Sequence, residues 1–214
     1  MIFNMYKPRG WTSFEMVKKV RMITKEKKVG HAGTLDPFAE GVLILGTGKD
    51  TKQLAEISSS KKKYRAVIKL GIQTDSLDIE GRITSEKEIP NLSVDKINSV
   101  LQSFLGDQLQ TPPMFSAKKV NGTRLYKLAR QNIEIKRDPC KIHINSIDLI
   151  GYNSPLITFQ VTCSKGTYIR VLGSDISEKL GTVGHLIELT RLSVGEYVVN
   201  DALHIEEFQE KWKS

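Results

Sequence analysis

Residues 30–52 read GHAGTLDPFAEGVLILGTGKDTK and are the most informative stretch of the chain. Residues Val29–Gly41, which overlap the first part of this stretch, are rich in glycine and contain Pro37, a composition typical of a loop. Gly41–Gly46 is apolar and has the length of a strand that is buried on both faces. Asp36 directly precedes Pro37. Taken alone, such a residue is a common turn former. A rigid loop of this composition would also hold its carboxylate open to a ligand.

The end of the same stretch, Gly46-Thr47-Gly48-Lys49, only partly matches two nucleotide-binding motifs. The phosphate-loop motif GxxxxGK[ST] needs glycine where Leu43 stands and serine or threonine where Asp50 stands. The dinucleotide motif GxGxxG needs its third glycine where Thr51 stands. The chain has no HExxH or CxxC motif, and its four histidines and two cysteines show no metal-ligand spacing. We therefore expect neither a metal nor a cofactor.

Helices and strands are predicted to be mixed along the chain. The predicted strands cover residues 2–5, 41–46, 64–70, 141–150, 156–163 and 189–194. The predicted helices cover residues 12–23, 51–57, 93–105, 125–130, 168–180 and 205–212. Thr12 and Glu15 form a capping box at the first helix, and Gly106 and Gly181 are expected to end two others. This irregular mixture predicts an α+β fold with a mixed, largely antiparallel sheet flanked by helices.

Charge is distributed unevenly along the 214 residues, whose 32 Lys and Arg and 24 Asp and Glu leave a net charge of +8. Residues 1–70 carry +9 and residues 111–141 carry +6, whereas residues 71–110 and 142–214 carry −4 and −3. Two basic blocks fit two contact surfaces on a nucleic acid, because Lys and Arg neutralise phosphates. The alternative is that these side chains only keep the surface soluble.

Composition and hydropathy bound the class of protein. With 39% apolar and 26% charged residues, the chain is typical of a globular protein. Lys7, Pro8 and Arg9 come before any apolar run that could serve as a signal peptide. The longest uncharged stretch, Leu149–Ser164, is too polar for a membrane span. We expect a cytoplasmic protein with reduced cysteines, folded as a single domain over residues 1–214.

Five ordered blocks of residues resemble the TruB family of pseudouridine synthases. The first is residues 30–52, whose GTLD segment resembles the G-x-L-D motif around the family's catalytic aspartate. The other blocks are Lys62–Arg65 with Gly71–Asp78, Thr111–Gly122 with Tyr126, Ala129 and Arg130, Cys163–Arg170, and Gly184–Leu192. With Lys7-Pro8 near the start, the resemblance extends over almost the whole chain. It implies the pseudouridine synthase catalytic fold.

The resemblance implies three catalytic residues. Asp36 is expected beside C1′ of a uridine, where the reaction breaks the C1′–N1 bond and joins C5 instead, with no cofactor because no atom is gained or lost. Arg170 is expected to pair with this carboxylate and favour its charged form. Taken alone, Arg170 is equally a surface arginine on a helix. Tyr64 is expected to stack on the uracil and handle the C5 proton, although a strand tyrosine alone indicates a core or edge position.

Five further residues are implied to bind the substrate. His31 resembles the family's histidine that enters the RNA when the target base leaves its stack. Lys52 matches a family lysine near the catalytic loop and is expected to contact phosphate. Tyr168 and Asp78 are expected in the uracil pocket. Leu189 is expected to line it too, with an ordinary core position as the alternative.

Two other basic segments are expected to contact RNA. Residues 111–139 form a long, proline-flanked excursion, and loops of that length are usually functional. By resemblance this segment is an inserted RNA clasp that orders on binding a folded RNA. The run Lys61–Lys63 is expected to contact phosphates. Because the chain stops at Ser214, shortly after the last predicted helix, we expect no C-terminal PUA-type RNA-binding domain.

The resemblance predicts an enzyme that isomerises uridine to pseudouridine at position 55 in the T-loop of tRNA, acting on a flipped-out base. The T-arm of tRNA is its expected partner, with no membrane and no metal, and we expect a monomer. Two alternatives stay open. One is a related synthase that acts on ribosomal RNA with guide partners. The other is a tRNA-folding chaperone in which catalysis is secondary or absent.

Overall fold

The computed structural model describes residues 1–120, 122–131 and 133–213. Three residues of the predicted insertion and C-terminus lie outside the described residues: Asn121, Asn132 and Ser214. The chain divides into two compact units, a terminal unit (Met1–Arg65 and Leu189–Ser214) and a central unit (Ala66–Glu188). That residues 1–214 act as one catalytic domain stays a prediction.

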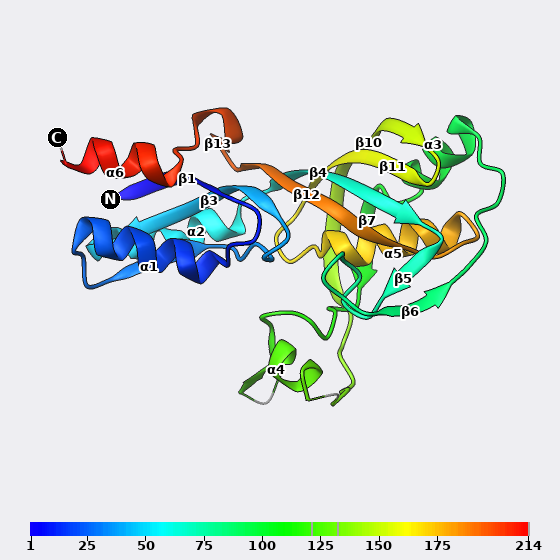
Figure 1. The fold of residues 1–214 in the computed structure, drawn as a ribbon, viewed down its shortest axis with the longest axis horizontal. Helices are drawn as coiled ribbons and strands as arrows, with labels where there is room; N and C mark the ends of the chain where they lie inside the picture. The colour runs from blue at the N-terminus through cyan, green and yellow to red at the C-terminus, as the bar shows by residue number, and fades with distance from the viewer. Residues whose placement is uncertain (121, 132, 214) are drawn as a thin grey trace. The chain divides into compact units, whose positions relative to one another are not determined.

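The terminal unit is built around one buried strand, β3 (Figure 1). Its elements, in chain order, are β1 (Ile2–Lys7), α1 (Ser13–Thr24), β2 (Val29–Ala32), β3 (Glu40–Thr47), the 3₁₀ helix η1 (Gly48–Lys52), α2 (Leu54–Ser59), the start of β4 (Lys62–Leu70), the end of β12 (Gly184–Val194), β13 (Tyr197–Val198), the 3₁₀ helix η2 (Val199–Asp201) and α6 (Ile205–Lys213). β3 pairs antiparallel with β1 along one edge. Along its other edge β3 pairs antiparallel with β2 and parallel with β12, where Arg191 lies opposite Gly41.

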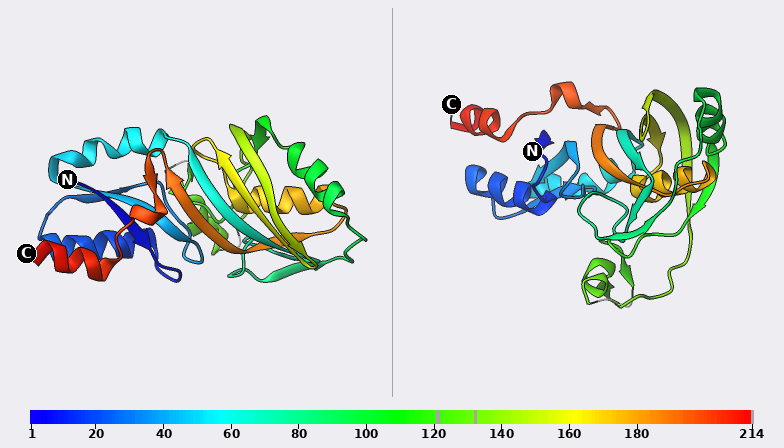
Figure 2. Two further views of the ribbon diagram at one scale, coloured as in Figure 1. Left: turned by 90° about the horizontal axis from the view of Figure 1, so that it is seen from above. Right: turned by 45° about the vertical axis from the view of Figure 1, so that its right-hand side comes forward.

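Both faces of β3 are covered by apolar side chains. Leu43 and Leu45 belong to a core cluster shared with α1 and α6, two helices that contact each other (Figure 2). Val42 and Ile44 alternate with them and pack in a second cluster with Leu54 of α2. The prediction of a strand buried on both faces is therefore confirmed.

The start of α1 matches the predicted capping box. The Thr12 hydroxyl accepts a hydrogen bond from the Glu15 N–H at 3.1 Å, and the Glu15 carboxylate accepts one from the Thr12 N–H at 2.6 Å. These two bonds satisfy backbone donors that have no partner within the helix. At the other end, Lys25 takes a left-handed conformation with φ of 57° and stops the helix after Thr24.

The central unit is an antiparallel sheet with helices packed on it. Its elements, in chain order, are the end of β4, β5 (Ile72–Thr74), β6 (Ile83–Glu86), α3 (Val94–Gln102), β7 (Gly106–Gln110), β8 (Lys119–Val120), β9 (Thr123–Arg124), α4 (Leu125–Ala129), β10 (Cys140–Asn153), β11 (Leu156–Cys163), α5 (Ile169–Lys179) and the start of β12. The strand order is β4, β11, β10, β7, and β10 pairs antiparallel with both neighbours. α3 contacts β10 and α5. The predicted α+β class is confirmed. Among the described residues, no helix is long and apolar enough to cross a membrane.

Residues 111–139, the insertion, lead from β7 to β10 and contain the hairpin β8–β9 followed by α4 (Figure 1). The predicted helix at residues 125–130 is confirmed. Leu125 is fully buried, and its N–H donates to the carbonyl of Lys118 at 2.9 Å. The Tyr126 N–H donates to the carbonyl of Ser116 at 3.0 Å. The insertion is therefore a small folded element whose basic side chains, such as Arg124, are exposed.

Three predicted boundaries are wrong, each because pairing with a distant segment outweighs the local pattern. The predicted loop Val29–Gly41 begins as a strand, since its first four residues pair with β3. The helix expected to run to Gly106 ends at Gln102, and Gly106 instead begins β7, which pairs with β10. β12 begins at Gly184 rather than Leu189.

Candidate active site

The Asp36 loop, residues 33–39, joins β2 to β3 in the terminal unit. Leu35 and Phe38 are only 4% and 3% exposed and attach the loop to the core, whereas Asp36 between them is partly exposed. The Asp36 carbonyl accepts a hydrogen bond from the Ala39 N–H at 3.1 Å, which closes a turn. The catalytic candidate therefore lies on a short, anchored turn.

Two buried polar side chains bind the backbone of this loop. The Ser13 hydroxyl accepts from the Leu35 N–H at 2.9 Å and donates to the Leu35 carbonyl at 3.1 Å. Lys7 is fully buried, and its ammonium donates to the carbonyls of Trp11 at 2.6 Å and Pro37 at 3.3 Å. Burying an ammonium is tolerable only with such acceptors. Sequence reasoning gave Lys7 and Ser13 no role; a charged residue that ends an apolar strand was the available signal for Lys7.

Four substrate-site or catalytic candidates share the terminal unit with Asp36. Tyr64 on β4 and Leu189 on β12 are 8% and 6% exposed. This burial is compatible both with the wall of a pocket and with a position in the core. His31 is partly buried on β2, and Lys52 is exposed at the end of η1. The exposed position of Lys52 suits a contact with phosphate.

The middle residue of the predicted phosphate-binding run Lys61–Lys63 does not face solvent. Lys62 is 5% exposed, and its ammonium donates to the carbonyls of Ser58 and of Ser60, the latter at 2.8 Å. The prediction is wrong for Lys62, because alternate side chains of a strand point to opposite faces. Lys61 and Lys63 are exposed.

A buried ion pair lies at the start of α5 in the central unit. Arg170 is 3% exposed and Asp78 is 4% exposed, with 3.5 Å between Arg170 Nη1 and Asp78 Oδ2. The guanidinium also donates to the carbonyls of Ser76 at 2.6 Å and Phe115 at 2.7 Å. The Asp78 carboxylate accepts from the Glu80 N–H at 3.0 Å. The interpretation of Arg170 as a surface arginine is therefore wrong, since its fork is buried and oriented by three groups.

Tyr168 directly precedes α5 and is linked to β7 through its backbone. Its N–H donates to the Gln110 side-chain oxygen at 2.7 Å, and its carbonyl accepts from the Gln110 amide at 3.1 Å. Gln110 is 4% exposed and lies immediately before the insertion. Tyr168, Arg170 and Asp78 thus share the central unit, whereas Asp36 belongs to the terminal unit, and the pairing of Asp36 with Arg170 stays a prediction.

One titratable group next to the Asp36 loop has a strongly shifted pKa. Burial, followed by the nearby Glu40 carboxylate, raises the pKa of Tyr6 to about 12. The Tyr6 ring stacks on His204, with 4.6 Å between the ring centres. Tyr6 is therefore a neutral phenol at physiological pH and can donate a hydrogen bond but not accept a proton.

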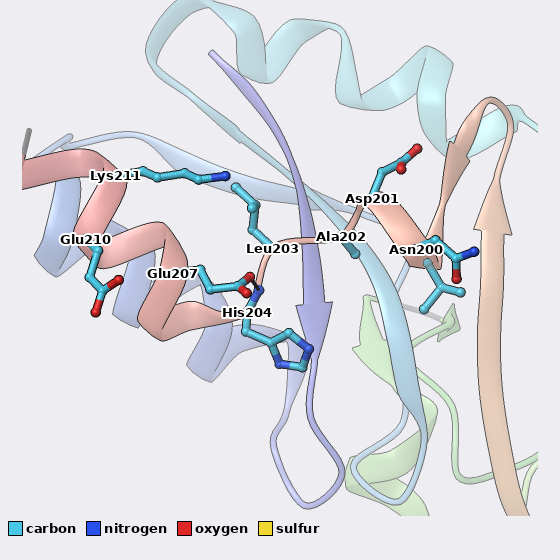
Figure 3. Close-up of a pocket in the computed structure, with 9 residues that line it drawn as sticks. Asn200, Asp201, Ala202, Leu203, His204, Glu207, Glu210 and Lys211 are labelled. Atoms are coloured by element: carbon cyan, nitrogen blue, oxygen red, sulfur yellow. Dashed lines mark hydrogen bonds between the residues drawn. The ribbon is translucent and has the colours of Figure 1, made fainter.

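A surface pocket of about 570 Å³ lies between α6 and the segment before it (Figure 3). It is lined by residues 199–204 and by Glu207, Glu210 and Lys211. Glu207 accepts a hydrogen bond from the His204 N–H at 3.0 Å and so caps α6. The pocket includes none of the predicted site residues. Within the described part of the chain, no three His, Cys, Asp or Glu side chains are grouped so as to hold a metal ion.

Solved structures define the fold class. The chain is similar to one in the crystal structure of a Cbf5–Nop10–Gar1 complex, with a TM-score of 0.78 and 26% identity over all of this chain and 55% of that chain. An archaeal box H/ACA Nop10–Cbf5 complex has the same fold, with a TM-score of 0.72 and 23% identity over 99% of this chain and 53% of that chain. The protein thus spans about half the length of these chains.

Sequence comparisons then give the family. Residues 21–169 match the model of the TruB family pseudouridylate synthase (N terminal domain). The tRNA pseudouridine synthase B of Clostridium tetani is 42% identical over 98% of this chain and 73% of the relative. That of Clostridium acetobutylicum is 47% identical over 98% and 72%. The chain belongs to the TruB family of pseudouridylate synthases, as its sequence blocks indicated.

Proposed function

We propose that this protein isomerises uridine to pseudouridine in tRNA and that its target is uridine 55 of the T-loop. Membership of the TruB family and the names of its relatives, tRNA pseudouridine synthase B, support the reaction and the substrate. The observation that carries the proposal is the Asp36 loop, a turn whose backbone is held by the buried side chains of Lys7 and Ser13 while Asp36 itself is partly exposed.

The chemistry needs a carboxylate of fixed position. Asp36 acts beside C1′ of the flipped uridine while the C1′–N1 bond breaks, the uracil turns, and C5 joins C1′. The C5 hydrogen leaves to solvent and N1 regains a proton, so the reaction is an isomerisation. A fixed loop lowers the entropic cost of bringing the carboxylate to the sugar. Tyr64 supports the uracil ring and takes part in the C5 proton transfer.

Arg170 supplies a buried positive charge for this site. Its fork is oriented by the carbonyls of Ser76 and Phe115, and Asp78 balances part of its charge. A guanidinium fixed in this way favours the ionised form of a carboxylate that approaches it. We place Asp36 opposite Arg170 in the working enzyme, with Tyr168 and Leu189 lining the uracil pocket and His31 entering the RNA.

The surface charge fits a folded RNA substrate. The two basic segments, residues 1–70 and 111–141, contain the Asp36 loop and the insertion. Exposed basic side chains of the insertion include Lys119, Arg124 and Lys127. We assign the insertion to the T-arm backbone, where shape and phosphates rather than base edges are recognised. The enzyme is proposed to work as a cytoplasmic monomer.

Release of tritium tests this function. An unmodified tRNA transcript with tritium at uridine C5 loses the label to water when pseudouridine forms. The wild-type protein should release it, and Asp36→Asn should abolish release while tRNA binding stays within about 3-fold, because the substitution is isosteric. A transcript with cytidine at position 55 should give no turnover.

Other outcomes separate the alternatives. Tight tRNA binding without tritium release from any tRNA would refute the enzyme and favour a tRNA-folding chaperone. Release from a ribosomal RNA fragment but from no tRNA would favour the related synthase. Undiminished release from the cytidine-55 transcript would leave the reaction standing and refute the T-loop assignment.

A further inference from the structure

Arg191 is a buried cation next to the Asp36 loop to which sequence reasoning gave no role. It lies on β12 and is 1% exposed, among the largest fully buried side chains of the protein. Among the described residues it makes no ion pair; its hydrogen-bond partners are backbone carbonyls. Burying a guanidinium without a carboxylate is costly unless its donors are satisfied. A buried arginine without an ion pair in the described part of the chain, next to the loop that carries the proposed catalytic carboxylate, therefore needs an explanation.

The guanidinium connects the Asp36 loop to the strand that follows it. Nε donates to the Val42 carbonyl at 2.6 Å, which joins Arg191 to β3. Nη2 donates to the Gly33 carbonyl at 3.1 Å, and Nη1 reaches the Thr34 carbonyl at 3.5 Å. The planar fork therefore connects the start of the loop, residues 33–34, to Val42 of β3 and sets the distance between them.

Close packing of β12 on β3 makes this bridge possible. Gly41 has φ of 102°, and a Cβ atom there would lie 2.9 Å from the backbone nitrogen of Arg191. Only glycine allows the two backbones to approach so closely. Gly33, with φ of 80°, is itself free to take conformations that other residues avoid, so the loop needs an external restraint at that point.

Together with Lys7 and Ser13, Arg191 binds four of the loop's backbone carbonyls. The carbonyls of five successive residues accept hydrogen bonds: Gly33 and Thr34 from Arg191, Leu35 from Ser13, Asp36 from the Ala39 N–H, and Pro37 from Lys7. Ser13 and Lys7 act on the part of the loop that follows Thr34. Arg191 alone among these side chains restrains Gly33 and Thr34, at the start of the loop.

We propose that Arg191 is a positioning residue for the catalytic carboxylate. It acts through the backbone of the Asp36 loop and does not touch the substrate. The inference rests on the proposed function, because the position of Asp36 matters only if Asp36 acts on the uridine. Its removal would let the loop move relative to β3, and a displacement of about 1 Å can cost about 100-fold in rate.

The test compares Arg191→Met, Arg191→Lys and Val194→Ala with the wild-type protein. Methionine keeps the apolar stem without donors, and lysine keeps the charge without the fork. Val194 is fully buried three residues further along β12, so Val194→Ala is a matched control for lost packing. Each protein is assayed for thermal midpoint, tRNA dissociation constant and single-turnover tritium release at saturating enzyme.

We expect Arg191→Met to release tritium about 100-fold more slowly while the tRNA dissociation constant stays within about 3-fold. Arg191→Lys should recover part of the rate. Val194→Ala should lower the thermal midpoint but keep the rate. If Arg191→Met does not fold, a slowed Arg191→Lys with a near wild-type midpoint supports the proposal, and an unslowed one overturns it.

Three results overturn the proposal. They are a folded Arg191→Met with the wild-type rate, an Arg191→Met that loses only tRNA affinity, and a Val194→Ala that loses as much rate at the same thermal midpoint. In each case the wild-type protein still releases tritium from tRNA. If the wild-type protein itself released no tritium from tRNA, the proposed function would be refuted instead. The failure of the Arg191 proposal and the failure of the proposed function are therefore distinguishable.

Discussion

Replacing Arg170 with methionine is expected to destabilise the central unit strongly. The substitution keeps a flexible apolar stem and removes the guanidinium that lies 3.5 Å from Asp78 and donates to the carbonyls of Ser76 and Phe115. Asp78 is 4% exposed and would remain as a buried carboxylate without this cation. A buried carboxylate without its cation is reached by neither a counter-charge nor water, so keeping it in the folded protein lowers the free energy of unfolding.

The magnitude follows from the burial of both partners. Breaking a buried ion pair by removing one partner costs about 3–5 kcal/mol. For a chain of this length, each kcal/mol lowers the thermal midpoint by about 2–4 °C, so Arg170→Met should lose about 6–20 °C. Asp78→Asn removes the charge but can still accept the bond from the Glu80 N–H. The double variant should therefore lose about 1–3 kcal/mol less stability than the two single variants lose together.

Urea unfolding followed by circular dichroism of the wild-type protein, both single variants and the double variant measures this coupling. Arg82→Met is the control, because Arg82 is an exposed arginine of the same unit and should stay within about 0.5 kcal/mol of the wild-type protein. Strictly additive single losses, or an Arg170→Met variant as stable as the control, would refute the reasoning that the pair is buried and coupled.

Two further predictions concern pH and salt. Burial, then repulsion from Glu178, raises the pKa of Asp175 to about 6, above its unfolded value, so the folded state gains stability as the pH falls through that value. Asp175→Asn should thus stabilise the protein by about 1 kcal/mol at pH 8, a value that allows for the partial exposure of Asp175. At about pH 4 the folded protein carries Asp175 protonated, so the substitution should not stabilise it. Urea unfolding checks this, and equal shifts of the urea midpoint at both pH values would contradict it. Replacing Lys119, Arg124 and Lys127 with alanine should weaken tRNA binding and reduce the slope of log K against log salt by about 0.7–0.9 per lost phosphate contact. Filter binding at several salt concentrations checks it, with Lys87→Ala/Lys96→Ala in the acidic block as the control; an unchanged slope would exclude the insertion from the RNA contact.

Local patterns predicted most of the secondary structure. The capping box at Thr12, the apolar run of β3 and the alternation of β4 each express a rule that acts within one helix or strand. β2 was missed because its glycine-rich sequence forms a strand only through pairing with β3. The start of β12 was missed for a similar reason, since its first residues lack a clear alternating pattern.

The motif around Asp36 and the blocks that hold Tyr64 and Arg170 were legible in the sequence, because they resemble blocks of the TruB family, to which the chain belongs. Only the tertiary structure placed Arg170 in a buried pair with Asp78, turned Lys62 inward, and put Lys7, Ser13 and Arg191 around the Asp36 loop. Arg191 is separated from its three acceptors by about 150 residues. Those acceptors are backbone carbonyls, which every residue possesses. No pattern of side chains can therefore reveal such a contact before the chain has folded.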